Sequence, residues 1–258
     1  MKSRLPWLSV GLGLALLIAW EALVRVAQTS ALVLPAPTVV AQTLWQGLRS
    51  GYLWPHIGHT LTEVVLGLGL GASLGFVGGV ALGESAALRR VLMPYVVISQ
   101  VVPKLALAPL FIVWFGFGTL PMVVMTALIC FFPLLENTVT SLQQVDPHKL
   151  ELFRMLRASA WQTLWRLKLP AGLPHIMAGV RVAVVLAWVG AVVGEFIGAS
   201  RGLGALIIAA QGSMDTPLMF AVLTVITVLG LASYAACTWL ERLCLRPLSN
   251  PVLPRKNP

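Results

Sequence analysis

The composition of this 258-residue chain places it in a lipid bilayer. Hydrophobic residues make up 58% of it and charged residues only 10%, whereas soluble globular domains are about 45–50% apolar and about 25% charged. These values exclude a soluble domain. The three cysteines lie in or beside apolar runs, which argues against a disulfide framework. The sequence therefore predicts an all-α membrane protein.

Apolar runs long enough to cross a membrane predict six transmembrane helices. A span needs about 20 apolar residues because the hydrocarbon core of a bilayer is about 30 Å thick. The six runs are 7–27, 60–82, 91–116, 121–143, 175–199 and 217–240. The first run follows two basic residues, as a secretory signal would. It is too long for a signal, however, and Glu21 and Arg25 stand where a cleavage site would need small residues, so we interpret it as a span.

The second run carries a stripe of glycines at every fourth position, Gly67, Gly71, Gly75, Gly79 and Gly83. Helices in lipid associate through close backbone approach, because no hydrophobic force drives them together. The stripe therefore predicts a helix-packing surface. Its Gly-x-Ser-x-Gly segment also matches the nucleophile pattern of hydrolases, but that pattern requires a strand–turn–helix setting, so we do not expect an enzyme.

The third run contains three prolines, Pro94, Pro103 and Pro109, with Lys104 among them. A proline inside a helix removes a hydrogen bond, and lipid tolerates this only where neighbouring helices or a cavity satisfy the freed backbone groups. The run therefore predicts a broken helix that lines a cavity. A lysine at membrane depth is costly and indicates a functional site.

Other polar residues of the spans are expected near Lys104, namely Gln100, Glu136, Asn137 and Glu195. Two interpretations remain open. In the first, these residues line a translocation pathway; in the second, Lys104 forms a structural pair with Glu136 or Glu195. His56 and His59 are three residues apart, but no third ligand lies near them in the sequence, so we predict no metal site.

The segment 146–174 is charged and lies between two apolar runs. Asp146 followed by Pro147 indicates the N-terminus of a helix. Apolar residues then recur on one helix face, at Leu150, Phe153 and Leu156. Such a short amphipathic helix outside the membrane needs a partner surface.

A second short helix is predicted directly after the first. Ser159 and Gln162 have the spacing of a capping box. An apolar stripe follows beside basic residues, with Trp161, Leu164 and Trp165 next to Arg166 and Lys168. We therefore expect two helices at an angle, ended by Leu169-Pro170, that together form a docking element.

The distribution of basic residues predicts the orientation in the membrane. With the N-terminus in the cytoplasm, most of the 18 basic residues are cytoplasmic: Lys2, Arg4, Arg89, Arg90, Lys149, Arg154, Arg157, Arg166, Lys168, Arg242, Arg246, Arg255 and Lys256. The opposite side holds Arg25, Arg49 and Arg201. Both termini and the docking element are thus predicted to be cytoplasmic. The net charge of +9 then reflects topology, and no nucleic acid partner is expected.

Residues 151–170 resemble the EAA loop of permease subunits of ATP-binding cassette importers. That loop has the pattern E-A-A, three residues, Gly, nine residues, I-x-L-P, and the spacing from Glu151 to Leu169-Pro170 fits it without a gap. Further segments resemble the nitrate, sulfonate, taurine and bicarbonate branch of that family: Leu34–Pro37, Pro109–Gly118, Phe132-Pro133, Val145–Pro147 and Val193–Gly204.

The resemblance implies a type I importer fold with six transmembrane helices and a cytoplasmic coupling loop at 146–174. It divides the chain into an N-terminal span (1–33), a permease core (34–246) and a cytoplasmic tail (247–258). Carried over by position, the residues that couple to the ATPase are Glu151, Arg154, Leu156, Arg157, Ala158, Ser159, Leu167 and Pro170.

The implied assembly has two copies of this chain, two ATP-binding cassette subunits and a periplasmic or lipid-anchored solute-binding protein, in the bacterial cytoplasmic (inner) membrane. The chain has no Walker-type phosphate loop. We therefore expect it to be non-catalytic and without a cofactor, with ATP and Mg²⁺ bound by the partner ATPase.

The sequence departs from the family pattern at two places. Leu152 and Phe153 replace the paired alanines, and Arg157 replaces the glycine. If the turn is left-handed, the arginine costs about 1 kcal/mol; otherwise the turn shifts by one residue. The second departure is Lys104, which follows Pro103 where sulfonate and taurine permeases have a second proline.

The substrate therefore remains open between two groups: sulfonates, taurine or nitrate on one side, and thiamine-precursor pyrimidines or riboflavin on the other. A different class of transporter is also open, a self-sufficient ion-coupled carrier in which Lys104, Glu136 and Glu195 form a relay. The carrier would leave the docking element without a function, and the two halves of the sequence show no inverted repeat.

Overall fold

The computed structural model describes residues 5–246, with side chains from residue 10 onward. In this range the chain is helical and contains no strand. The predicted tail 247–258 and residues 1–4 lie outside the described residues. The elements are α1 (Leu5–Val26), α2 (Pro37–Arg49), α3 (Trp54–Glu84), α4 (Ala86–Val101), η1 (Lys104–Leu107), α5 (Ala108–Phe115), α6 (Thr119–Gln143), α7 (Pro147–Met155), α8 (Ala160–Thr163), η2 (Leu164–Lys168), α9 (Leu169–Gly198), α10 (Leu203–Gly212) and α11 (Thr216–Leu245).

Four helical stretches of the described chain are long and apolar enough to cross a membrane: α3, α6, the continuous stretch from α8 to α9, and α11. A fifth arises if α4 and the η1–α5 segment count as one span. α1 is a helix of 22 residues at the position of the first predicted span. At 1.5 Å per residue it is about 33 Å long, which matches the hydrocarbon thickness.

The third predicted span is not one straight helix. α4 and the following η1–α5 segment meet at an angle of 81°. The break falls at Val102, which has an extended conformation (φ −64°, ψ 124°) and precedes Pro103. A residue before proline avoids the helical region because the proline ring collides with its backbone. Pro94, in contrast, lies inside α4 without ending it.

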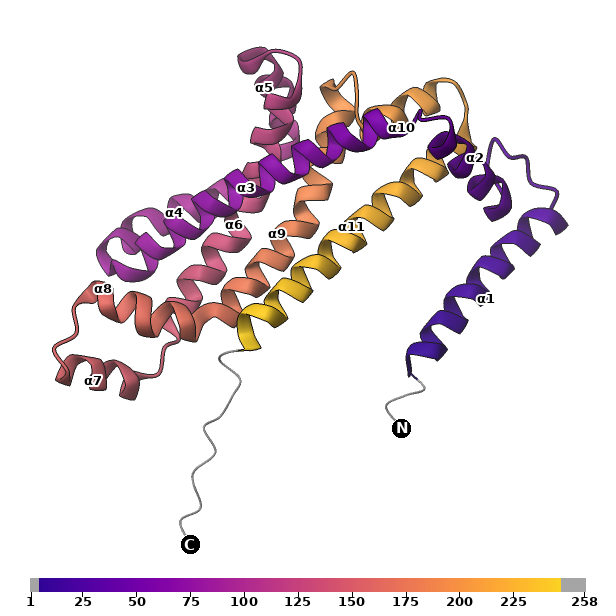
Figure 1. Ribbon diagram of the computed structural model, residues 1–258. Coiled ribbons are helices and arrows are strands. Elements are labelled where there is room, and N and C mark those ends of the chain that lie inside the picture. Colours follow the sequence, from indigo (N-terminus) through magenta and orange to yellow (C-terminus); the bar gives the residue numbers. More distant parts are fainter. Residues whose placement is uncertain (1–4, 247–258) are drawn as a thin grey trace, which may run out of the picture.

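Three helices, α3, α6 and α9, form the centre of the bundle (Figure 1). The glycine stripe of α3 faces α6 at very short range. A Cβ on Gly67 would lie 2.6 Å from Cγ2 of Thr126, and one on Gly79 would lie 2.6 Å from Cβ of Thr138. Both distances are too short for real atoms, so only glycine permits this approach, as expected for a packing surface in lipid.

The short helix α10 closes one end of the bundle against α2, α3 and α11. Its apolar side chains form a buried cluster with residues of the neighbouring helices, Leu53, Leu203, Leu206, Ile207, Val222 and Val225. At the opposite end lie α7 and α8, the start of α1 and the end of α11 (Figure 1). The bundle therefore has one end closed by α10 and another that carries the predicted docking element.

Candidate functional site

The docking element begins with the helix that the sequence predicts. The side chain of Asp146 caps α7 by accepting a hydrogen bond from the backbone N–H of His148 at 2.9 Å. Pro147 stands in the first turn, where its missing N–H costs nothing. In Figure 1, α7 lies apart from the bundle, and none of its residues is buried.

The turn after α7 is left-handed at Arg157, which has φ +51°. Two backbone hydrogen bonds close it, from Arg157 N to the carbonyl of Arg154 (2.9 Å) and from Ala158 N to the carbonyl of Phe153 (3.0 Å). These are the two bonds of a Schellman motif, which ends helices with a left-handed residue that is usually glycine. The structure thus keeps the turn at the position of the family glycine and does not shift it by a residue.

The second predicted helix also begins where expected. Ser159 accepts a hydrogen bond from Gln162 N (3.2 Å), and the Gln162 side chain accepts one from Ser159 N (2.9 Å), which completes the capping box. Its predicted end at Leu169-Pro170 is wrong, because the helix continues through the π-helical turn η2 into α9. Pro170 falls at the start of α9, directly after the π-helical bonding of η2, so it does not break the helix.

The exposed side chains of this element form an apolar surface with a charged rim. Its apolar members are Leu152, Met155, Leu156, Trp161 and Trp165. Glu151, Arg154 and Arg157 are exposed beside them. We call these eight residues the docking surface. Several large apolar side chains exposed outside the membrane-spanning helices indicate an interaction site.

Other residues of the predicted coupling set hold the element in place. Leu167 is buried, and Pro170 and Ala158 are half-buried. Lys168 pairs with Glu84 at the end of α3 at 2.7 Å. The base of the element is therefore fixed to the bundle, while the docking surface projects from it.

The predicted pathway residues do not all meet. Lys104 Nζ donates to Gln100 Oε1 at 3.0 Å, so these two lie together at the bend between α4 and η1. Glu136 is exposed on α6, and Asn137 donates to the carbonyl of Pro133 at 2.7 Å. The predicted structural pair of Lys104 with Glu136 or Glu195 is absent among the ion pairs of residues 5–246, because the bend directs Lys104 to its own segment.

Glu195 instead belongs to a buried polar cluster at the α10 end of the bundle. Its Oε1 accepts from Thr60 Oγ1 at 2.6 Å and its Oε2 from Gly204 N at 2.5 Å. Thr60 Oγ1 in turn accepts from Leu203 N at 2.8 Å. Glu63, one turn after Thr60 on α3, completes the cluster, and both glutamates are buried. These bonds attach α10 to α3 and α9.

Sequence reasoning missed Thr60 and Glu63. The available clue was the spacing of His59 and Glu63, which puts both on one face of a helix. That clue gives no information about Glu195, which is far away in the chain and near only in the fold.

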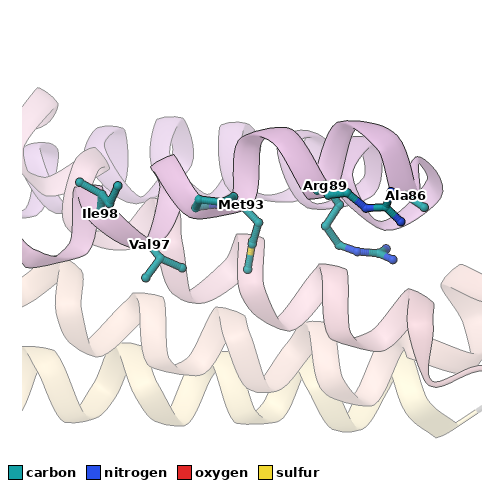
Figure 2. A pocket seen from close by; sticks show the side chains of 7 residues that line it. Ala86, Arg89, Met93, Val97 and Ile98 are labelled. Atoms are coloured by element: carbon teal, nitrogen blue, oxygen red, sulfur yellow. The ribbon is translucent and has the colours of Figure 1, made fainter.

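An open groove of about 700 Å³ runs along α4, lined by Ala86, Arg89, Arg90, Met93, Pro94, Val97 and Ile98 (Figure 2). Met93 and Val97 project from the same side of the helix as Arg89. No residue of α4 is buried in the chain. Only one side of α4 is partly covered, where Met93 and Val96 pack against Leu82, Leu135 and Val139. The rest of the helix is exposed, so α4 offers a surface to another component.

Comparisons with known proteins identify the family. Residues 67–245 match the model of the family described as binding-protein-dependent transport system inner membrane component. The chain is 39% identical over 246 residues to the riboflavin transport system permease protein RibX of Chloroflexus aurantiacus, covering 94% of this chain and 92% of that protein. It is 34% identical over 233 residues to the formylaminopyrimidine transport permease protein ThiX of Halalkalibacterium halodurans (90% and 92% covered), and 31% identical over 257 residues to the taurine transport system permease protein TauC of Escherichia coli (98% and 90% covered).

A solved structure of the MetNI methionine ABC transporter in inward facing conformations shares the fold. Its TM-score is 0.64 at 20% sequence identity, over 74% of this chain and 94% of that one. The type I importer fold is therefore confirmed. With its membrane-spanning helices and its exposed docking surface, the chain belongs to the binding-protein-dependent transport system inner membrane components, the multi-pass, non-catalytic permease subunits of ATP-binding cassette importers.

Proposed function

We propose that this permease moves a small polar or anionic organic solute into the cell by inserting its docking surface into a separate ATPase subunit. The observation that carries the proposal is the exposure of Leu152 and Met155 on α7, and of Leu156 directly after it, outside the bundle. Covering exposed apolar side chains with a partner surface stabilises the complex by about 25 cal/mol per Å² of apolar area buried. ATP and Mg²⁺ bind the partner subunit, and force enters this chain through α7.

Two copies of the chain form the pathway in this proposal. α4 supports it, since none of its residues is buried in one chain. Glu136 supports it as well, because its side chain is exposed on a membrane-spanning helix. A charge facing lipid costs about 2.5–3.5 kcal/mol on insertion scales, so this face of α6 belongs against a second copy or an aqueous pathway.

Both termini lie in the cytoplasm in this proposal. α1 begins and α11 ends at the end of the bundle that carries α7 (Figure 1). The basic residues of this end, such as Arg166 and Lys168, agree with the preference of lysine and arginine for the cytoplasmic side. The α10 end then faces the solute-binding protein.

The solute class follows from the relatives and from Lys104. The named relatives include permeases for riboflavin, formylaminopyrimidine and taurine. Lys104 is half-buried at the α4–η1 bend and donates a hydrogen bond to Gln100. It therefore offers one positive charge at the break between the two helices. Uptake competition with riboflavin, a formylated aminopyrimidine and taurine identifies the class, and competition by none of the three contradicts it.

The coupling proposal is tested with a pair of matched variants. Leu156 and Leu231 have nearly equal exposed fractions, 69% and 67%, but Leu156 lies after α7 and Leu231 lies within the membrane-spanning α11. In vesicles that contain the assembled transporter, we expect Leu156→Ala to reduce the solute moved per ATP hydrolysed, whereas Leu231→Ala transports normally.

Two results would contradict the proposal. One is equal coupling in the Leu156→Ala and Leu231→Ala transporters. The other is solute accumulation in vesicles that contain this chain without an ATPase, because a permease of this kind has no energy source of its own.

A further inference from the structure

A histidine joins the buried carboxylates at the α10 end of the bundle. His59 Nδ1 and one carboxylate oxygen each from Glu63 and Glu195 lie within 4.8 Å of one another. Glu63 is fully buried and Glu195 is 1% exposed. Three potential metal ligands from α3 and α9 thus converge in the interior.

Three polar atoms of Glu63 and His59 have no hydrogen-bond partner among the described residues. Both carboxylate oxygens of Glu63 and the Nδ1 of His59 are buried and unpaired. His59 Nδ1 lies 3.3 Å from Glu63 Oε1, yet the two atoms do not form a hydrogen bond. Leaving buried polar groups unpaired costs about 1–3 kcal/mol each, and more for charged groups. Such a group in a native structure requires an explanation, and a bound ion is one that fits these side chains.

The charges of the cluster also favour a bound cation. Glu63 lies beside Glu195, and no lysine or arginine of residues 5–246 forms an ion pair with either side chain. Two buried carboxylates repel each other and lose their hydration, so they need about two positive charges for neutrality. A single divalent cation supplies both.

We propose that His59, Glu63 and Glu195 bind one divalent first-row transition metal ion, with Zn²⁺ as its probe. Imidazole nitrogen with carboxylate oxygen suits zinc better than Mg²⁺ or Ca²⁺, which prefer oxygen ligands alone. Zinc ligands at about 2.0–2.2 Å in a tetrahedron lie about 3.4 Å apart. The His59–Glu63 separation of 3.3 Å matches this value. The other pairs lie within 4.8 Å and need to approach by up to about 1.4 Å.

The surroundings of Glu195 fit a metal ligand. Thr60 and the Gly204 N–H each bond one of its oxygens and fix its orientation, which is what the partners of ligating carboxylates do. Each carboxylate oxygen has a second lone pair, so these bonds leave room for a metal. The metal would bridge α3 and α9 beneath α10.

The metal content of the assembled, detergent-solubilised transporter tests the proposal. The protein carries no histidine tag, is stripped with EDTA and is titrated with Zn²⁺ by calorimetry, with metal content measured by mass spectrometry. We expect one Zn²⁺ per permease chain. His59→Gln should weaken binding at least tenfold, and Zn²⁺ should raise the thermal midpoint of the wild type only.

His175→Gln is the matched control, because it removes an exposed histidine from the other end of α9 and should bind as the wild type does. Glu63→Gln tests a second ligand. If the Glu63→Gln transporter does not assemble, the comparison of His59→Gln with the wild type decides the test. The proposal is overturned if the stripped wild type takes up no Zn²⁺, or if His59→Gln and His175→Gln bind it equally well. Either result would mean that protons, and not a metal ion, neutralise Glu63 and Glu195.

Discussion

The contact between α3 and α6 can be tested at Gly71. A Cβ at this position would lie 2.9 Å from Cα of Ala127, with the Ala127 backbone carbonyl closer still. Ordinary carbon contacts are about 3.5–4.0 Å, so the two helices must separate by at least half an ångström. Overpacking of this kind costs about 1–3 kcal/mol. Gly71→Ala should therefore destabilise the protein even though alanine favours a helix over glycine by about 1 kcal/mol.

Gly69→Ala is the control for this change. Gly69 lies on the exposed side of the same helix, and a Cβ there would meet no atom within 4 Å. The gain in helix propensity is common to both variants, so their difference in unfolding free energy isolates the steric overlap. We expect Gly71→Ala to be less stable than Gly69→Ala by about 1–3 kcal/mol, measured by SDS-induced unfolding from micelles with tryptophan fluorescence. Equal midpoints for the two variants would refute the packing argument.

Three further changes address the docking element and the α10 attachment. Arg157 has a positive φ, which glycine adopts without strain, so Arg157→Gly should stabilise the turn after α7 by up to about 1 kcal/mol. Backbone hydrogen exchange in this turn should then be slower, and faster exchange would contradict the reasoning. Ser159→Ala should speed exchange at the start of α8 through the loss of about 1 kcal/mol of capping energy, and unchanged exchange would refute the capping box. Thr60→Val should lower the thermal midpoint, because it removes the bonds to Glu195 and Leu203 N, at a cost of about 1–3 kcal/mol; an unchanged midpoint would show that these bonds add no stability.

The local features of the docking element were predictable because they depend on neighbouring residues. Asp146 and Ser159 cap helices through contacts two or three residues away, and the left-handed turn at Arg157 needs only the preceding turn. The end of the second helix was predicted wrongly at Pro170. A proline normally indicates a boundary, but the π-helical turn before it accommodates the missing N–H, and sequence patterns do not predict such turns.

The position of Glu195 was not predictable, because it depends on which helices become neighbours. Its partner Thr60 is 135 residues away in the chain. Lys104, an equally plausible partner by charge, bonds Gln100 at the end of the preceding helix α4 instead. The glycine stripe predicted that α3 packs closely against something, but the periodicity of α3 does not identify α6 as the partner. Which helices become neighbours depends on the packing of the whole bundle.

The continuity of α8, η2 and α9 connects the two ends of the protein. The helix runs from Ala160 to Gly198 and is about 58 Å long at 1.5 Å per residue. Trp161, in the docking surface, and Glu195, in the buried cluster, are therefore parts of one helix. A displacement of the docking surface moves the helix as a body, except where η2 and Pro174 allow it to bend. Because Glu195 holds Gly204 of α10, the proposed coupling would carry that movement to α10 at the far end of the bundle, and a metal ion between α3 and α9 would resist it.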